Sequence, residues 1–439
     1  MHRILSIISI IICFVCQVSG QQVLTPEEAT RKALEHNYGI KIAKNTVEIA
    51  ENNSGILNSG YLPSVTGNAG ATIERQNSEG QLANGESRVA EGAETRRYNA
   101  SVSLNYLLFD GLGRYYNYQR LKEEYQLSEL DARETIETTI IQLFTVYYTV
   151  AQLSENTSAL EQTLAISKNR LTRAGYQFDY GQNTKLEVLN AEVDINNDSI
   201  NLINAYQQLK NTKRDLNFIL GNSLTDNFSV DTELSFLIQL NREELLGQLR
   251  ANNVSILRAE RSIAIGEYDI KTSKAQFLPT VGLVGTYGWN ESSNNSPLAF
   301  VLQNTSTGVS GGVNLTWNLF DGGGTMSRVK NAKIALESQE LQKEELVLSV
   351  ERDFNNAWDD YQNKLTIYQV QEDNIITAQN NFDRTEEKFK LGQVTSIEFR
   401  QAQLNLLNAE LTLNQAKYDA KLSELNVLQL SGELLNVNL

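Results

Sequence analysis

Residues 104–111 read Leu104-Asn105-Tyr106-Leu107-Leu108-Phe109-Asp110-Gly111, and residues 315–322 repeat the pattern as Leu315-Thr316-Trp317-Asn318-Leu319-Phe320-Asp321-Gly322. The two aspartates lie 211 positions apart. A second motif returns at the same offset, because Gly181-Gln182-Asn183-Thr184-Lys185-Leu186-Glu187 matches Gly392-Gln393-Val394-Thr395-Ser396-Ile397-Glu398. The segment between the motifs has the same length in both halves, as expected of a packed rod rather than a loop. The chain is therefore a tandem repeat, which has to be recognised before any fold is assigned.

Each half contains two stretches in which apolar and polar residues alternate. The first stretch follows a Leu-Pro pair, Leu62-Pro63 in one half and Leu278-Pro279 in the other. Alternation over ten or more residues predicts β-strands. We expect strands at about residues 64–76, 98–109, 280–290 and 308–319, with polar loops of about 20 residues at 75–97 and 290–308. Aromatic residues near the strand ends are predicted to face the bilayer interface, with a packed sandwich core as the alternative: Tyr98, Tyr106, Trp289 and Trp317.

Helix-start signals open each half. The sequence Leu24-Thr25-Pro26-Glu27-Glu28 aligns with Leu240-Asn241-Arg242-Glu243-Glu244, so that Thr25 or Asn241 precedes two acids. A capping residue followed by acids in the first turn predicts a helix. The two helices are expected to run to about Ser59 and Ala275, where the Leu-Pro pairs stop them.

Two segments are unusually long for helices. Neither residues 114–174 nor residues 325–391 contain glycine or proline. At 1.5 Å per residue they predict helices of roughly 90 to 100 Å. Each is followed by the Gly-Gln turn of the second motif and by a returning helix that ends near Gly221 or Gly432. We therefore expect helical hairpins at about residues 112–220 and 325–431.

The strands of one chain cannot close a sheet within a membrane. An open edge would leave backbone groups unpaired in hydrocarbon. The smallest single-chain barrels have eight strands, so several copies of a four-stranded chain must combine, and three copies would give twelve strands. In each half both strands join helices at the same end, so all helices should lie on one side of the membrane. The predicted fold is a mixed α and β membrane protein that works as a trimer.

The first 20 residues are predicted to be a cleaved signal peptide. Arg3 precedes a nearly continuous apolar run over residues 4–15, and small residues follow it, which is the pattern of a secretory signal. Both cysteines, Cys13 and Cys16, lie inside this segment, so the mature chain is expected to have no disulfide. Lipid attachment at Cys16 is the alternative. The two repeats are then assigned to residues 21–232 and 233–439.

The chain is acidic, with a net charge of −15. Loss of Arg3 with the signal peptide would make this charge one unit more negative. Nucleic acids are polyanions that bind basic surfaces. The composition therefore argues against nucleic acid and anionic lipid as partners.

Taken in order, these motifs resemble the TolC-type outer-membrane efflux protein family. The resemblance rests on the doubled layout, the Leu-Pro pairs before strands, the Leu-Phe-Asp-Gly strand ends, and hairpin tips followed by Asn190-Ala191 or Gln401-Ala402. It covers residues 21–439. It implies a homotrimer in the bacterial outer membrane, surrounded by outer-membrane lipid, whose twelve-stranded β-barrel continues into an α-helical periplasmic tunnel. It also implies passive export, with a periplasmic adaptor protein and an inner-membrane pump as partners.

The resemblance places the candidate functional residues at the hairpin tips. It implies an acidic ring that narrows the tunnel near the second tip, at the positions of Glu398 and Gln401, with Glu187 at the matching place in the first half. Gln401 is an amide, which lowers the charge expected of such a ring. The two acids could instead complement the positive ends of the returning helices. Adaptor contacts, or turn residues alone, are predicted at the tips themselves: Gly181, Gln182, Gly392 and Gln393.

The two halves differ most just after the tips. There Glu187-Val188-Leu189-Asn190 stands opposite Glu398-Phe399-Arg400-Gln401. Because both tips are expected to reach the same depth, this difference is where we predict the gate.

The sequence contains no recognisable catalytic constellation. The mature chain has one histidine, His36, and neither a metal-spaced His or Cys cluster nor a phosphate-binding loop after a strand. We therefore predict neither enzyme activity nor a cofactor. The alternative from another class of function is a secreted or surface coiled-coil structural protein without a pore, which fractionation would separate from an outer-membrane channel. The exported substrate, the class of pump and the gating trigger are not defined by the sequence.

Overall fold

The computed structural model describes residues 23–81, 83–225, 227–237, 240–296 and 298–436. The predicted signal peptide and Cys16 lie outside these residues. The chain forms two compact units. The sheet unit consists of Thr46–Glu129 and Arg258–Glu344, and the helical unit consists of the described residues up to Asn45 with Leu130–Leu257 and those from Glu345 onward.

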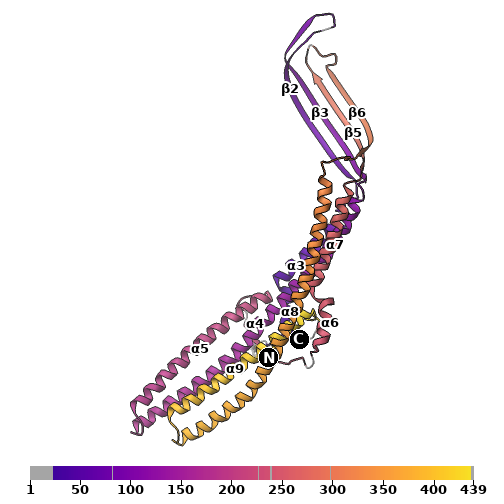
Figure 1. The fold of residues 1–439 in the computed structure, drawn as a ribbon. Helices are drawn as coiled ribbons and strands as arrows, with labels where there is room; N and C mark the ends of the chain where they lie inside the picture. The colour runs from indigo at the N-terminus through magenta and orange to yellow at the C-terminus, as the bar shows by residue number, and fades with distance from the viewer. Residues whose placement is uncertain (1–22, 82, 226, 238–239, 297, 437–439) are drawn as a thin grey trace, which may run out of the picture. The chain divides into compact units, whose positions relative to one another are not determined.

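The sheet unit is built around four antiparallel strands. They are β2 (Ser64–Gln81), β3 (Ser87–Phe109), β5 (Thr280–Asn294) and β6 (Gln303–Thr316), in the spatial order β2-β3-β5-β6 (Figure 1). The strand ends that connect to helices lie at the same end of the sheet, since Ser64 pairs with Asn105 and Thr280 pairs with Thr316. The connections between β2 and β3 and between β5 and β6 therefore lie at the opposite end, which we call the loop end.

The register gathers apolar residues on one face of the sheet. Val65 lies opposite Leu104 and Leu283 lies opposite Val313, and Tyr106 on β3 lies opposite Leu283 on β5. Since side chains alternate between faces, these residues share one face across all four strands. The other face is polar, as shown by a hydrogen bond of 3.1 Å between the hydroxyls of Ser103 and Thr286.

The predicted long loops were wrong in extent, because the strands continue into them. Pairing of β2 with β3 persists to Gln81 opposite Ser87, with an irregularity between Gln76 and Ser78. β5 and β6 likewise reach Asn294 and begin at Gln303. A strand pair that is polar on both faces has no apolar period, so alternation alone could not reveal it.

The predicted end of the last strand also differs. β6 ends at Thr316 rather than at residue 319, so Trp317 lies beyond the sheet. Its partner strand starts at Thr280, directly after Pro279, which lacks a backbone N–H. Trp317 turns back instead, and its Nε1 donates a hydrogen bond of 3.0 Å to the carbonyl oxygen of Phe277.

The repeated aspartates begin the long helices. A carboxylate oxygen of Asp110 accepts the backbone N–H of Arg114 at 2.8 Å, and Asp321 accepts both the backbone N–H and the hydroxyl of Thr325, each at 2.6 Å. The hydroxyl and the backbone N–H of Thr325 hold the pKa of Asp321 below its usual value. Gly111 has a φ of 70°, and a Cβ there would meet the carbonyl oxygen of Ala275 at 2.5 Å. The Leu-Phe-Asp-Gly motif thus combines a turn with a helix cap.

The long helices form two hairpins of matching size. α4 (Gly113–Asp179) and α8 (Gly324–Lys390) have 67 residues each, and α5 (Lys185–Leu220) and α9 (Ser396–Ser431) have 36 residues each. α4 and α8 contribute residues to both units. Among the helices of the described residues, none has the length and apolar character needed to cross a membrane.

Each predicted N-terminal helix is in fact two helices. They are α2 (Pro26–His36) and α3 (Tyr38–Ser54) in the first half, and α6 (Arg242–Asn252) and α7 (Val254–Ala275) in the second. The side chains of Thr25 and Asn241 cap α2 and α6, as predicted. The unforeseen breaks fall at Asn37 and Asn253, which leave the helical conformation.

Both breaks are stabilised by the same tertiary contact. The side-chain amide of Asn37 donates to the carbonyl oxygen of Ile219 at 2.8 Å, and that of Asn253 donates to Leu430 at 2.9 Å. The side-chain oxygen of each asparagine accepts a backbone N–H of the following helix. The asparagines therefore cap one helix and satisfy the carbonyl end of another.

The core of the helical unit lies where the two hairpins meet the short elements. Strands β1 (Val23–Leu24) and β4 (Ser229–Val230) pair in parallel there. Tyr147 is fully buried, and its hydroxyl donates to the carbonyl oxygen of Leu24 at 2.7 Å. Around it pack buried apolar residues from all four long helices, including Phe144, Leu216, Phe354 and Leu425.

Candidate functional site

The two hairpin tips have the same backbone turn. Gly181 and Gly392 adopt φ angles of 71° and 73°, and a Cβ at either position would meet nothing within 4 Å. The N–H of Gln182 donates to the carbonyl oxygen of Gln177, and that of Gln393 donates to Lys388. These bonds and a left-handed glycine form the usual end of a helix. Conformation rather than close packing therefore accounts for the glycines, whereas Gln182 and Gln393 are exposed.

Glu398 is bound into the start of α9. Its carboxylate accepts the backbone N–H of Thr395 at 2.7 Å and the Thr395 hydroxyl at 2.8 Å, while the Thr395 hydroxyl accepts the N–H of Glu398 at 3.2 Å. The N–H and then the hydroxyl of Thr395 hold the pKa of Glu398 below its usual value. This reciprocal pair is a capping box, so Glu398 has a structural role within its own helix.

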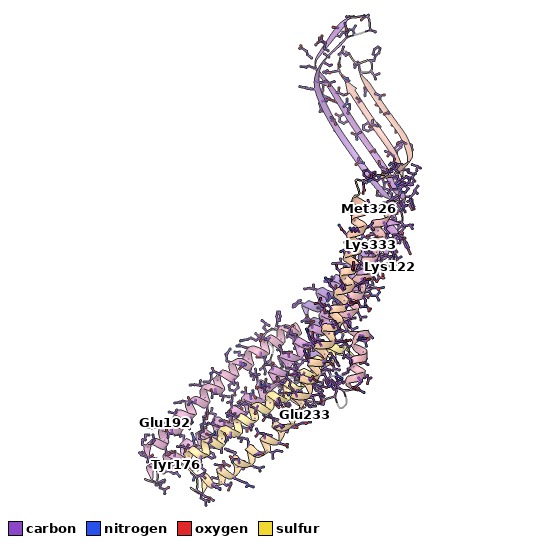
Figure 2. All side chains as sticks on the ribbon, viewed as in Figure 1. Lys122, Tyr176, Glu192, Glu233, Met326 and Lys333 are labelled. Atoms are coloured by element: carbon purple, nitrogen blue, oxygen red, sulfur yellow. The ribbon has the colours of Figure 1, made fainter. Side chains whose placement is uncertain are left out.

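Glu187 has a different environment, although it occupies the equivalent position. Thr184, at the start of α5, makes no side-chain capping bond. The Oε2 atom of Glu187 is buried, and none of the described residues forms a hydrogen bond with it. Figure 2 places Tyr176 and Glu192 near this same tip, on α4 and α5.

A cavity of about 280 Å³ near the tips brings two of the predicted residues together. Glu187 and Gln401 both line it, together with Arg170, Asp194 and Arg400. Gln401 is exposed, and its amide donates to the side chain of Asn405 at 2.8 Å. Glu398 is not among the residues that line this cavity. Of the two residues predicted to share one ring, only Gln401 lines this cavity.

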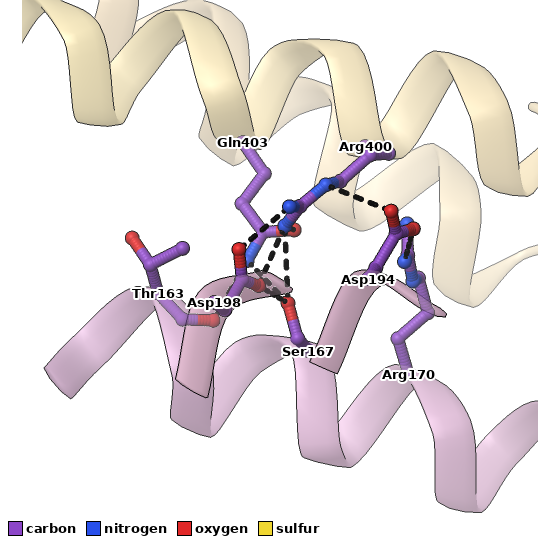
Figure 3. A network of polar contacts seen from close by, with 7 residues as sticks. All are labelled: Thr163, Ser167, Arg170, Asp194, Asp198, Arg400 and Gln403. Carbon is purple, nitrogen blue, oxygen red and sulfur yellow. Dashed lines mark hydrogen bonds and ion pairs between the residues drawn. The ribbon is translucent and has the colours of Figure 1, made fainter. Parts of the chain in front are cut away.

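A polar network beside this cavity joins the two hairpins. Two terminal nitrogens of Arg400 on α9 donate to the two carboxylate oxygens of Asp198 on α5, at 2.7 and 2.8 Å (Figure 3). Asp198 is only 3% exposed and also accepts the hydroxyl of Ser167 on α4 at 2.6 Å. Gln403 donates to the carbonyl oxygen of Thr163 at 2.8 Å. A bidentate Arg–carboxylate pair of this kind is both directional and strong.

Asp194 extends the network towards the tip. It lies between two cations, accepting a hydrogen bond from Arg170 on α4 and lying 3.7 Å from Nε of Arg400. Asp194 and Asp198 are four residues apart and Ser167 and Arg170 are three apart, so each pair shares one helix face. The network therefore holds the second hairpin against both helices of the first within one chain.

Sequence reasoning did not predict this network. The stretch that differs between the halves was predicted to hold the gate, but no partner was assigned to Arg400, which stands where the first half has Leu189. The available signal was the replacement of an apolar residue by a cation in the stretch that differs between the halves. Its partners could not be identified, because pairing across helices far apart in the sequence depends on their packing.

Aromatic residues strengthen the second tip. Phe389 and Phe399 stack with ring centroids 4.6 Å apart, and Phe382 packs against Phe399 at 5.7 Å. The guanidinium of Arg173 lies 5.0 Å from the ring centroid of Phe389 and donates to the carbonyl oxygen of Lys390.

Three of the four predicted interface aromatics share the apolar face of the sheet. Tyr98 lies opposite Ala71, Tyr106 opposite Leu283, and Trp289 opposite Ala100. Trp317 lies outside the strands, as described above. Among the residues that the structure describes, no group of three or more His, Cys, Asp or Glu side chains is arranged to bind a metal ion.

Comparison with known proteins identifies the family. The family model described as outer membrane efflux protein matches residues 29–222 and again residues 245–433. The chain belongs to this outer membrane efflux protein family. The family consists of transport proteins rather than enzymes, and the protein is located in the outer membrane.

Relatives and solved structures agree with this assignment. The chain is 23% identical to the outer membrane efflux protein BepC of Brucella suis, over 95% of this chain and 88% of that protein. It is 24% identical to the outer membrane protein TolC of Vibrio cholerae, over 67% of this chain and 68% of that protein. The fold is similar to the CmeC outer membrane channel of Campylobacter jejuni, with a TM-score of 0.78, 18% identity, and coverage of 93% of this chain and 86% of that one.

Proposed function

We propose that the protein is the passive exit duct of a tripartite efflux or secretion system. Three copies form a twelve-stranded β-barrel in the outer membrane, and their helices form a tunnel in the periplasm. A periplasmic adaptor protein docks on the hairpin tips, and an inner-membrane pump supplies the energy. The duct itself performs no chemistry.

The observation that carries this proposal is the sheet with one apolar and one polar face. A four-stranded sheet in which β2 and β6 are the outer strands has two edges without a partner among the described residues. Its apolar face would contact lipid, and its polar face would line a lumen. Pairing of β6 with β2 of another copy removes both edges, which a membrane requires.

Substitutions on adjacent residues of β6 test the two faces. Val309 lies opposite Tyr287 on the apolar face, and Ser310 lies opposite Thr286 on the polar face. We expect Val309→Lys to impair assembly, because a lysine on the lipid face is destabilising, by up to about 2–4 kcal/mol at mid-membrane. Ser310→Lys should assemble as a detergent-resistant trimer and conduct in planar bilayers with a reduced preference for cations. Equal tolerance of both lysines, or a wild-type protein without conductance, would overturn the proposal.

The tips are proposed to supply the aperture and the adaptor contact. Glu398, Gln401 and Glu187 are the aperture candidates, and Gln182 and Gln393 are the exposed tip residues available to an adaptor. Glu398→Ala should raise or alter conductance and weaken block by multivalent cations. Because Glu398 also caps α9, Thr395→Ala is the matched control, since it disrupts the capping box but keeps the carboxylate.

The two variants separate charge from structure. A change in conductance with Glu398→Ala but not with Thr395→Ala supports an aperture role. The same change in both variants, or in neither, assigns Glu398 to helix capping alone. Gln182→Ala with Gln393→Ala should reduce adaptor-dependent export without changing the conductance of the isolated trimer.

A further inference from the structure

The apolar face of the sheet ends in charged side chains towards the loop end. Along β2, Ile73 is followed on this face by Arg75, and along β3, Tyr98 is followed by Arg96 and then Glu94. Arg96 lies opposite Ile73, and Glu94 lies opposite Arg75. Residues directly opposite each other in a sheet share a face. The two arginines therefore continue the row of apolar residues rather than the polar face.

Glu94 holds the two guanidinium groups together. Its Oε2 lies 2.9 Å from a terminal nitrogen of Arg75 and 3.0 Å from Nε of the same residue, and its Oε1 lies 2.5 Å from Nε of Arg96. Their side chains are 76% and 54% exposed, whereas that of Glu94 is 13% exposed. A guanidinium carries five N–H donors, so both arginines keep donors for a further anion. The three residues together carry one positive charge, so this site can attract an anion although the whole chain is acidic.

The neighbouring rows place this cluster at a membrane boundary. Tyr98 is the next residue on the face of β3, and Trp289 lies one row further, opposite Ala100. Towards the loop end, this face shows apolar residues first, then tryptophan and tyrosine, and then cations. Hydrocarbon, interface and headgroups follow one another in the same order in a bilayer. Figure 1 shows that β2 and β3 extend beyond β5 and β6 at this end. The cluster lies where β5 ends, because Thr95 is the last residue of β3 paired with β5.

We propose that Arg75 and Arg96 bind the phosphate of an anionic lipid headgroup in the leaflet at the loop end. Arginine matches phosphate geometrically with two parallel hydrogen bonds. The apolar face next to the cluster receives the acyl chains, which a free phosphate ion lacks. This inference rests on the proposed membrane-spanning sheet.

Arg97 provides a matched control at the same height. It lies opposite Thr72 on the polar face, and it forms an ion pair of 3.2 Å with Glu74. It should have no contact with lipid. Glu291 shares the apolar face, opposite Tyr98, and accepts a hydrogen bond from Gln303 at 3.2 Å. Replacing Glu291 with an uncharged residue should strengthen the binding of an anion on this face.

The experiment measures binding of diphosphorylated lipid A to the detergent-solubilised protein, with dephosphorylated lipid A and inorganic phosphate as comparison probes. The double variant Arg75→Gln/Arg96→Gln should weaken binding roughly 30-fold, from about fivefold for each cation near a lipid surface. Arg97→Gln should stay within about twofold of wild type and Glu291→Gln should bind more tightly. Inorganic phosphate should not compete at millimolar concentration.

Each alternative result overturns the inference. It fails if Arg97→Gln loses as much affinity as the double variant, if both lipids bind wild type equally, or if inorganic phosphate competes. Should the glutamine double variant not assemble, Arg75→Lys/Arg96→Lys keeps the charge and must still prefer the phosphorylated lipid. Conductance of the same preparations is recorded in planar bilayers. Normal conductance without lipid preference refutes this inference alone, whereas absent wild-type conductance refutes the proposed function.

Discussion

The two hairpin tips start from the same sequence pattern and reach different structures. Both have a left-handed glycine followed by a threonine and, three residues later, a glutamate. At the second tip Thr395 and Glu398 cap each other, whereas at the first tip Thr184 makes no such bond and Glu187 keeps a buried oxygen without a partner in the described chain. A motif that is shared between repeats therefore guarantees the turn but not the role of its acid.

The difference continues two residues further along. Arg400 reaches across to Asp198 in the first hairpin, while Leu189 at the equivalent position is 46% exposed. The helix breaks at Asn37 and Asn253, by contrast, are stabilised by the same contact in both halves. The repeats thus remain alike where helices end against each other, and they have diverged where the two hairpins meet.

The largest expected effect comes from giving the second tip the residue of the first. Arg400→Leu removes the cation from the buried carboxylate of Asp198, which should destabilise the tip by about 3–5 kcal/mol. Hydrogen exchange of the amides around Ser167 and Asp198 measures this loss. Leu189→Ala is the control and should cost less than about 1 kcal/mol. Similar losses of protection in both variants would contradict the asymmetry.

The two helix breaks should lose similar stability when their asparagines are replaced. Asn37→Ala and Asn253→Ala each remove a helix cap and leave a carbonyl oxygen without its donor, at a cost of about 2 kcal/mol. Thermal unfolding of the purified protein, followed by circular dichroism, gives the comparison. Asn374→Ala, at an exposed site, should change stability by less than about 0.5 kcal/mol. A clear difference in stability between Asn37→Ala and Asn253→Ala would show that the two helix breaks are not equivalent.

A smaller difference is expected from the capping threonines. Thr395→Ala should destabilise the start of α9 by about 1 kcal/mol, while Thr184→Ala should change the start of α5 by only a few tenths. Amide exchange in the first turn of each helix reports both values. If the two substitutions have equal effects, the capping box does not distinguish the tips.

The smallest effect is a pH dependence at the second tip. Hydrogen bonds from Thr395 lower the pKa of Glu398 from its ordinary value of 4.5. The resulting stabilisation is present above pH 4.5 and is lost as the pH falls through the lowered pKa. Exchange of the first-turn amides of α9 should therefore increase in acid in wild type, after correction for intrinsic rates. Glu398→Gln should remove this dependence, and its persistence would assign the effect to another group.

The sequence predicted the local features that depend on neighbours along the chain. The caps at Thr25 and Asn241 were predicted correctly, as were the glycines that end α5 and α9, because each is formed within one or two helical turns. The breaks at Asn37 and Asn253 were missed. An asparagine within a helical pattern is unremarkable until a second helix end presents a carbonyl oxygen to its side chain.

Periodicity by itself determined that the chain is a repeat of strand pairs and long helical hairpins, since alternation and the absence of glycine and proline are properties of the chain alone. The resemblance to the family followed from the order and spacing of these motifs. Only the tertiary structure decided which charges pair. Arg400 meets Asp198 across about 200 residues of sequence, and Arg75 joins Arg96 through Glu94 because of the strand register. Such contacts depend on how elements pack, which no local pattern specifies.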